Sequence, residues 1–187
     1  MPTGFPDVVA VMLRRADLLF NVERSRLRPE HLRLLHHVHM TRGASEQQLG
    51  SSLLLRPAKL SSLLADLEAA ELIRRTDKRV IARSLARAFA ARRIIAVEAK
   101  VRDWRRALNQ AITNTWFASH SYVLLPESSW SPILGRRARR HGVGVLLSNG
   151  SHLSIRVHAR KHSLPASYGS WLVSEWALRQ TARMSGR

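Results

Sequence analysis

Cysteine is absent from this chain of 187 residues. Its absence excludes disulfides, thiolate metal sites and thiol nucleophiles together, and it suits a reducing compartment. Acidic residues are scarce, because 13 Asp and Glu stand against 31 Lys and Arg, for a formal net charge of +18. A chain this basic predicts a polyanionic partner, nucleic acid first. Since Arg outnumbers Lys, the base composition of a genome is the other explanation of the excess.

Long apolar runs are also missing. No stretch of the sequence approaches the ~18 apolar residues that a membrane-spanning helix needs. The N-terminus has no basic segment followed by the apolar segment of a signal peptide. We therefore expect a cytoplasmic protein without a membrane partner, whose length suits one medium domain or two small ones.

The first apolar run follows an opening that contains proline and glycine, Met1–Pro6, which predicts a turn. Val8–Met12 is continuously apolar and rich in β-branched residues, as in a strand buried on both faces. A helix that continues to Phe20 is the alternative.

Residues 27–83 show a helical pattern instead. Pro29 begins one predicted helix, Ser45 with a glutamine three residues later forms a capping box for a second, and Pro57 begins a third. Residues 72–81 then predict a strand, a turn and a strand.

This order of elements, carried most clearly by Ser45–Leu49 and Leu63–Arg75, resembles the winged helix-turn-helix of bacterial transcriptional regulators. In such modules the third helix enters the major groove of DNA and the hairpin, or wing, lies along the backbone. A winged helix used only for protein contact is the alternative. By position, the implied DNA-binding residues are Arg56, Lys59, Ser61 and Ser62 on the third helix and Arg74, Arg75, Lys78 and Arg79 on the wing.

Beyond residue 88, strand and helix patterns alternate, which is typical of α/β proteins. The predicted strands are 93–100, 121–126, 142–148 and 153–157, and the predicted helices are 103–111, 130–140 and 168–181. The helix over 130–140 carries the densest basic run, which we expect either to follow DNA phosphates or to form a solvated helix face. That run is Arg136, Arg137, Arg139 and Arg140.

Charged residues stand at the tips of two apolar runs. Asp7 precedes the first run, and Glu98 and Lys100 follow Ile94–Val97. Residues two apart on a strand share a face, so Glu98 and Lys100 should emerge together while Ala99 points into the core. Carboxylate oxygens are the ligands that Mg²⁺ prefers, and one or two suffice because the ion keeps several waters. A lysine beside them can stabilise charge that develops on a phosphoryl group.

Pro6-Asp7, Glu98-Ala99-Lys100 and the segment Asp103–Ala111 together resemble the PD-(D/E)XK nuclease superfamily. The resemblance implies an α/β (α+β) fold with a nuclease-like mixed sheet flanked by helices, and a winged helix inserted between the Asp strand and the ExK strand. It implies Mg²⁺ or Mn²⁺ as cofactor and Asp7 and Glu98 as metal ligands. The catalytic residues that it implies are Asp7, Glu98, Lys100 and Gln110.

The sequence also departs from that family. Where some branches place a tyrosine four residues after the glutamine, this chain has Asn114. The helix and first strand that the family carries before its Asp strand have no counterpart before Asp7.

These features predict a discontinuous nuclease-like domain over 1–20 and 88–187 and a winged-helix domain over 27–83. The leading hypothesis is a DNA-binding protein that cuts phosphodiester bonds as a Mg²⁺-dependent deoxyribonuclease, positioned by its winged helix. The alternative is a non-catalytic transcriptional regulator with a degenerate nuclease fold. A third interpretation is a protein-interaction module of a toxin or defence system. DNA is the expected partner, together with a second copy of the chain in a homodimer.

Other chemistry-bearing residues lack a supporting pattern. No zinc-binding spacing or nucleophile elbow is present. We expect a helix surface for the clustered histidines His36, His37 and His39, and the core for the tryptophans Trp116, Trp171 and Trp176.

Overall fold

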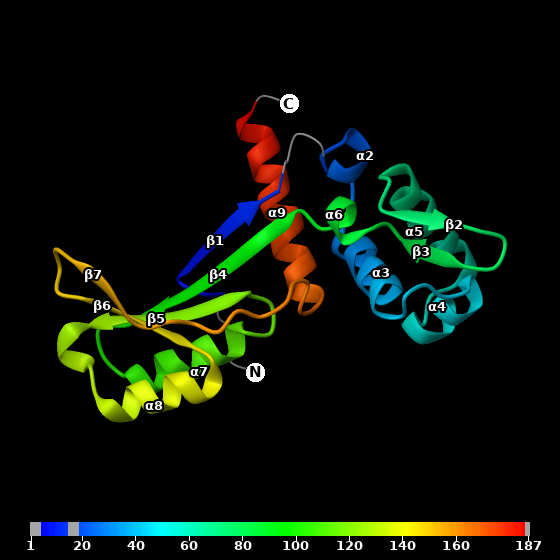
Figure 1. Ribbon diagram of the computed structural model, residues 1–187. Helices are drawn as coiled ribbons and strands as arrows, with labels where there is room; N and C mark the ends of the chain where they lie inside the picture. The colour runs from blue at the N-terminus through cyan, green and yellow to red at the C-terminus, as the bar shows by residue number, and fades with distance from the viewer. Residues whose placement is uncertain (1–4, 15–18, 186–187) are drawn as a thin grey trace. The chain divides into compact units, whose positions relative to one another are not determined.

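The computed structural model describes residues 5–14 and 19–185 (Figure 1). Contacts between Cα atoms divide the chain into two compact units. The first, which we call the sheet unit, comprises Met1–Met12 and Arg92–Ser170. The second, the helical unit, comprises Leu13–Ala91 and Trp171–Arg187. The predicted opening turn, Met1–Pro6, lies largely outside the described residues.

One mixed sheet contains β1 (Val8–Leu13), β4 (Ala91–Ala99), β5 (His120–Pro126), β6 (Gly144–Ser148) and β7 (Leu153–Val157), in that order. β4, β5 and β6 run parallel, and β7 runs antiparallel to β6. β1 is antiparallel to β4, because Asp7 just before β1 bonds to Ala99, whereas Arg14 just after it bonds to Ala90. A strand, not the alternative helix, therefore forms over Val8–Leu13, but its side chains alternate between exposed and half-buried, so the predicted burial on both faces was wrong.

Two helices pack on one face of this sheet, α7 (Trp104–Asn114) and α8 (Pro132–His141), with the 3₁₀ turn η1 (Glu127–Ser129) before α8 (Figure 1). Small and branched side chains from the helices and strands form one buried cluster. It includes Ala107, Leu108, Ala111, Leu134, Ala138, Val123, Leu125, Val145 and Leu147. The predicted combination of a mixed α/β fold and a sheet flanked by helices is therefore confirmed.

The two faces of β4 are not arranged as predicted at its carboxyl end. Ile94, Ala96 and Glu98 are buried, whereas Ala99 is half-buried on the opposite face. Glu98 pairs in register with Val123 of β5, whose side chain belongs to the core under α7 and α8. The prediction that Ala99 points into the core was wrong, because an apolar run of four gives no sign of which face a helix will cover.

The helical unit contains α2 (Val22–Ser25), α3 (Pro29–Met40), α4 (Glu46–Leu53), α5 (Pro57–Ala69), β2 (Ile73–Arg75), β3 (Val80–Ala82) and α6 (Leu85–Ala88). The predicted capping box of α4 is confirmed, since Ser45 and Gln48 exchange hydrogen bonds. β2 and β3 form an antiparallel hairpin. A single antiparallel β-bridge joins Ala44, between α3 and α4, to Val80 of β3.

The helix α9 (Tyr168–Met184) contributes its residues from Trp171 onward to the helical unit. The sequence pattern predicts this segment within the nuclease-like domain, so the division by contacts differs there from the predicted boundaries. Trp171 accounts for the difference: it is 2 % exposed and lies edge-on to Phe89 at 5.1 Å between ring centroids. Its Nε1 donates to His36 Nδ1 at 3.2 Å.

Several ring side chains therefore differ from expectation. His36 and His39 are half-buried near Trp171 instead of lying on an open helix surface, and burial lowers the pKa of each. Trp116 and Trp176, expected in the core, are 52 % and 58 % exposed.

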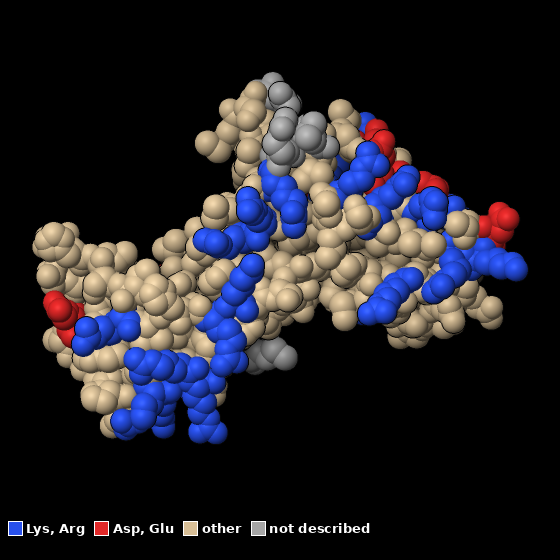
Figure 2. All heavy atoms as spheres, in the orientation of Figure 1, with Lys and Arg blue, Asp and Glu red and all other residues tan. Residues whose placement is uncertain are grey.

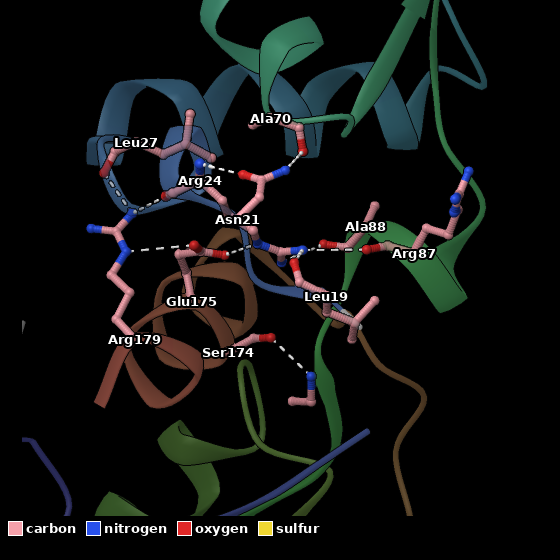
Figure 3. A network of polar contacts seen from close by, with 11 residues as sticks. Leu19, Asn21, Arg24, Leu27, Ala70, Arg87, Ala88, Ser174, Glu175 and Arg179 are labelled. Carbon is pink, nitrogen blue, oxygen red and sulfur yellow. Dashed lines mark hydrogen bonds and ion pairs between the residues drawn. The ribbon is translucent and has the colours of Figure 1, made fainter. Parts of the chain in front are cut away.

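A buried polar network holds α9 to the rest of the helical unit (Figure 3). Arg24, 2 % exposed, donates through Nε to Glu175 Oε2 at 3.0 Å. Its other nitrogens donate to the carbonyl oxygens of Leu19, Arg87 and Ala88. One arginine thus satisfies carbonyl groups from two separate segments and also neutralises a buried acid.

Candidate functional site

Lys100 links the two carboxylates that the sequence singled out. Its Nζ lies 2.9 Å from Asp7 Oδ2 and 3.9 Å from Glu98 Oε2. The antiparallel pairing of β1 with β4 brings them together, since it sets the beginning of one strand beside the end of the other. Although Asp7 and Lys100 are 93 positions apart in the chain, the side chains of Asp7, Glu98 and Lys100 are neighbours in the fold.

Asp7 is the exposed member of this group. Its Oδ2 accepts hydrogen bonds from Lys100 Nζ at 2.9 Å and from the backbone N–H of Ala99 at 2.8 Å. The bond from Lys100, and after it the bond from Ala99, lowers the pKa of Asp7 below its ordinary value. Asp7 is therefore a carboxylate at neutral pH.

Glu98 is the buried member, at 1 % exposure. Burial raises its pKa, and the nearby negative charge of Asp7 raises it further, while a hydrogen bond from Asn114 acts in the opposite direction. Asn114 Nδ2 donates that bond to Glu98 Oε1 at 2.8 Å. The neighbouring carboxyl groups thus have pKa values shifted in opposite directions, an arrangement that is frequent at functional sites.

Asn114 is the residue that sequence reasoning missed. In the sequence it stands out only as a departure from a family pattern, yet it is 4 % exposed and binds Glu98 directly. Its position one helical turn after Gln110 was the available signal, because residues four apart share a helix face. Gln110 itself is half-buried, and its buried Oε1 has no hydrogen-bond partner among the described residues.

Asp103, the next acidic residue along the chain, is the N-cap of α7. Its side chain accepts a hydrogen bond from the backbone N–H of Arg106 at 3.1 Å and so caps α7. Asp103 has a φ of 56°, in the left-handed region that Asp tolerates better than most residues. The cap fixes the start of the helix that carries Asn114.

The oxygen atoms at this site are of the type that a small, hard divalent cation prefers. Asp7 and Glu98 offer carboxylate oxygens beside each other, and Mg²⁺ or Mn²⁺ would complete its coordination with water and substrate oxygens. No cluster of three or more His, Asp or Glu side chains that could hold a metal occurs in the part of the chain that the structure describes. The fit therefore depends on these two carboxylates alone.

The predicted basic run lies on the outer side of α8. Leu134, Gly135 and Ala138 are buried, so the arginines between and after them face solvent. Figure 2 shows Lys and Arg side chains gathered over the part of the sheet unit that α7 and α8 occupy. The exposed residues there include Arg105, Arg106, Arg136, Arg137, Arg139 and Arg140.

The residues expected to contact DNA in the helical unit are exposed, and some already have partners. Lys59 Nζ binds Glu30 at 2.6 Å, Arg75 pairs with Glu46, and Arg79 donates to the carbonyl oxygen of Gly43 at 2.6 Å. Among residues that the structure describes, Arg56, Arg74 and Lys78 have no ion-pair partner. Ser61 and Ser62 are exposed on α5.

No protein-family model matches the sequence, and no curated protein matches it. Among solved structures, the SPO1766 protein of unknown function from Silicibacter pomeroyi is similar over 49 % of this chain and 60 % of that chain, with 16 % sequence identity and a TM-score of 0.36. None of the helices in the described ranges has both the length and the apolar character needed to cross a bilayer.

Proposed function

We propose that this protein binds DNA and cuts its phosphodiester backbone at the Asp7, Glu98 and Lys100 group with the help of Mg²⁺ or Mn²⁺. The observation that carries the proposal is the position of Lys100 Nζ within 4 Å of both carboxylates, one ionised and exposed, the other buried. Burial and the negative charge of Asp7 both raise the pKa of Glu98, and pKa shifts of this kind are frequent at functional sites.

Each residue has a role that follows from its surroundings. Asp7 and Glu98 would hold the cation, whose chemistry is to polarise a phosphoryl oxygen and to lower the pKa of an attacking water. Lys100 would stabilise negative charge on the phosphoryl group. Asn114 holds Glu98 Oε1 and so leaves Oε2 for the side that Lys100 occupies. Gln110 lies one turn earlier on α7 and has an acceptor oxygen to offer.

The helical unit supports the DNA-binding part of the proposal. Helix α3, the bridge at Ala44, helices α4 and α5 and the hairpin of β2 and β3 follow the order of a winged helix-turn-helix. In that arrangement the outer face of α5 meets base edges and the hairpin meets phosphates. Arg56, Ser61 and Ser62 would belong to the first contact, and Arg74 and Lys78 to the second.

Nicking of a supercoiled plasmid in the presence of Mg²⁺ tests the proposal. We expect the wild type to nick, and Glu98→Ala or Lys100→Ala to reduce the rate by at least about 100-fold, because each removes charge from the reacting centre. Asn109→Ala is the matched control, since it removes an exposed polar side chain of α7 in the same unit and should keep the rate. Nicking retained in both site variants would refute the proposed site.

A second function is favoured by a different observation. The negative charge of Asp7 is already neutralised by Lys100, so the group is satisfied without a cation. We propose as the alternative a non-catalytic, winged-helix transcriptional regulator in which this group only stabilises the sheet. It predicts sequence-selective DNA binding that Glu98→Ala leaves unchanged, with no nicking by any form of the protein.

A further inference from the structure

A cleft of about 610 Å³ opens at the carboxyl ends of β4, β5 and β6. This volume lies within the range of about 300 to 1,000 Å³ that is usual for small-ligand sites. Ligands of sheets with parallel strands commonly bind beyond the carboxyl ends of those strands. The cleft therefore has the size and the location of a binding site.

The cleft shares Ala99 and Lys100 with the candidate site. Lys100 lines it, and the same ammonium lies 2.9 Å from Asp7. A ligand in the cleft would therefore lie next to the chemical group on which Asp7 and Glu98 act, or would be covalently joined to it.

The lining is not that of a phosphate site. Among the described residues that line the cleft, Lys100 is the one cation, and Glu127 opposes an anion. Phosphate sites commonly combine such a lysine with arginines or with the backbone N–H groups of a helix N-terminus. A second phosphate of a nucleic-acid strand is therefore not the natural occupant.

The lining matches a flat group with an apolar face and a polar edge. Leu124, Pro126 and the 78 % exposed Val101 offer apolar surface, whereas Glu127 and Asn149 offer polar atoms. Asn149 Oδ1 already accepts hydrogen bonds from the backbone of the turn after β6, which leaves its amide nitrogen as the donor that it can offer. A nucleobase has this combination of a hydrophobic face and hydrogen-bonding edge.

We propose that this cleft binds one unpaired nucleobase of the DNA, adjacent to the phosphodiester bond at the Asp7, Glu98 and Lys100 group. The inference rests on the proposed function and adds the substrate class: DNA with a single-stranded, bulged or mismatched nucleotide. A base inside a paired duplex cannot enter a cleft of this kind, and extruding it costs a few kcal/mol. A nucleotide that is already unpaired avoids that cost.

Three DNA substrates test the proposal: a paired duplex, the same duplex with a one-nucleotide bulge, and the same bulge with an abasic residue that lacks the base. We expect the full-length protein to cut the bulged DNA faster than the paired DNA, and to bind it more tightly in fluorescence anisotropy, by about tenfold. The abasic bulge should behave like the paired duplex, because the bulge without its base offers nothing to the cleft.

Two variants connect the preference to the cleft. Val101→Asp replaces apolar surface at the rim with charge, and Ser128→Trp fills space at η1, so both should bring the bulged-to-paired ratio close to one. Ile133→Asp is the control, because Ile133 is 52 % exposed and does not line the cleft, and its ratio should stay at the wild-type value.

The outcomes separate this inference from the function on which it rests. Equal cutting and binding of all three DNAs by the wild type would overturn the nucleobase site and leave the nuclease proposal intact. If the abasic bulge were cut and bound as well as the normal bulge, DNA bending would explain the preference, and the site would again be refuted. If nothing is cut, the nuclease proposal fails, while tighter binding of the bulge that Val101→Asp abolishes would still support a nucleobase site.

Discussion

At the scale of single residues, burial and the hydrogen bond from Asn114 shift the pKa of Glu98 in opposite directions, and burial has the larger effect. Glu98 binds its proton more tightly in the folded protein than in the unfolded chain, because burial raises its pKa. Its contribution to stability is therefore fully present at pH values below its unfolded pKa and is lost as the pH rises through the raised folded pKa. Asp7, with a lowered pKa, contributes in the opposite sense, and its stabilisation is lost as the pH falls.

Asn114→Leu should shift the pH dependence of metal binding. The hydrogen bond from Asn114 lowers the pKa of Glu98, so its removal raises that pKa further. A divalent cation needs the deprotonated carboxylate, and the pH at which Mn²⁺ binding reaches half its maximum should therefore move upward. Titration calorimetry with Mn²⁺ between about pH 5 and 8 measures the shift.

Asn109→Leu is the matched control for that experiment, because Asn109 lies on the same helix with its side chain exposed. Its midpoint should coincide with that of the wild type. Identical midpoints for Asn114→Leu and the wild type would remove Asn114 from its role as a positioning residue. Asn114→Leu should also lower the free energy of unfolding by about 1 to 3 kcal/mol, since it leaves the buried Glu98 Oε1 without its hydrogen-bond donor.

At the scale of elements, α8 presents the most concentrated charge in the sheet unit. Arg136 and Arg140 lie one turn apart and therefore share a helix face. Each lysine or arginine that neutralises a DNA phosphate releases a counterion, so its contribution shows in the salt dependence of binding. A solvated helix face, the alternative interpretation, has no such effect.

The double variant Arg136→Ala with Arg140→Ala should weaken DNA binding and flatten its salt dependence. If both arginines meet phosphates, the slope of log K against log salt concentration should become less negative by about 1.8. Anisotropy titrations over a range of salt concentrations measure it. The variant with lysine at both positions keeps the charge and should keep the slope, whereas an unchanged slope in the alanine variant would indicate a solvated face.

The elements also show what the sequence pattern could specify. Local signals predicted α3, α4 and α5 well, because Pro29, the Ser45 capping box and Pro57 are features that mark where helices begin. Pairing between distant strands was inferred for Asp7 and Glu98 only through a family pattern, not from any local signal. The choice of face on β4 depends on α7, which no residue of β4 itself encodes.

At the scale of the whole molecule, α9 belongs to the helical unit from Trp171 onward, whereas the sequence pattern grouped it with the strands of the sheet. Its apolar spacing predicts a helix but does not identify the surface against which that helix packs. The deciding contacts involve Trp171, with its hydrogen bond to His36, and Glu175, with its ion pair to Arg24. Each partner is more than a hundred positions away, beyond the reach of any pattern in a local window.

Arg24→Met should destabilise the protein severely. It removes the closer of the two guanidinium groups paired with the buried Glu175, leaves Arg179 Nε at 3.5 Å from Glu175 Oε1, and frees the carbonyl oxygens of Arg87 and Ala88. Loss of one partner from a buried ion pair typically costs about 3 to 5 kcal/mol. Urea denaturation measures the free energy of unfolding.

Arg26→Ala is the matched control, because Arg26 forms an exposed ion pair with Glu23 that should be worth about 0 to 1 kcal/mol. The double variant Arg24→Met with Glu175→Leu should recover part of the loss, since it removes the stranded charge. A small effect of Arg24→Met would mean that the network in Figure 3 does not hold α9 in place.

The long separation between Asp7 and its partners has a consequence for synthesis of the chain. Asp7 leaves the ribosome first, and Lys100 follows 93 residues later. At about 5 to 20 residues per second, the carboxylate waits about 5 to 20 s for its lysine. Any activity of the group would therefore begin only after the whole segment between Asp7 and Lys100 had been translated. Because the proposed winged helix lies within that segment, a nascent chain cannot cut DNA before its winged helix has been made.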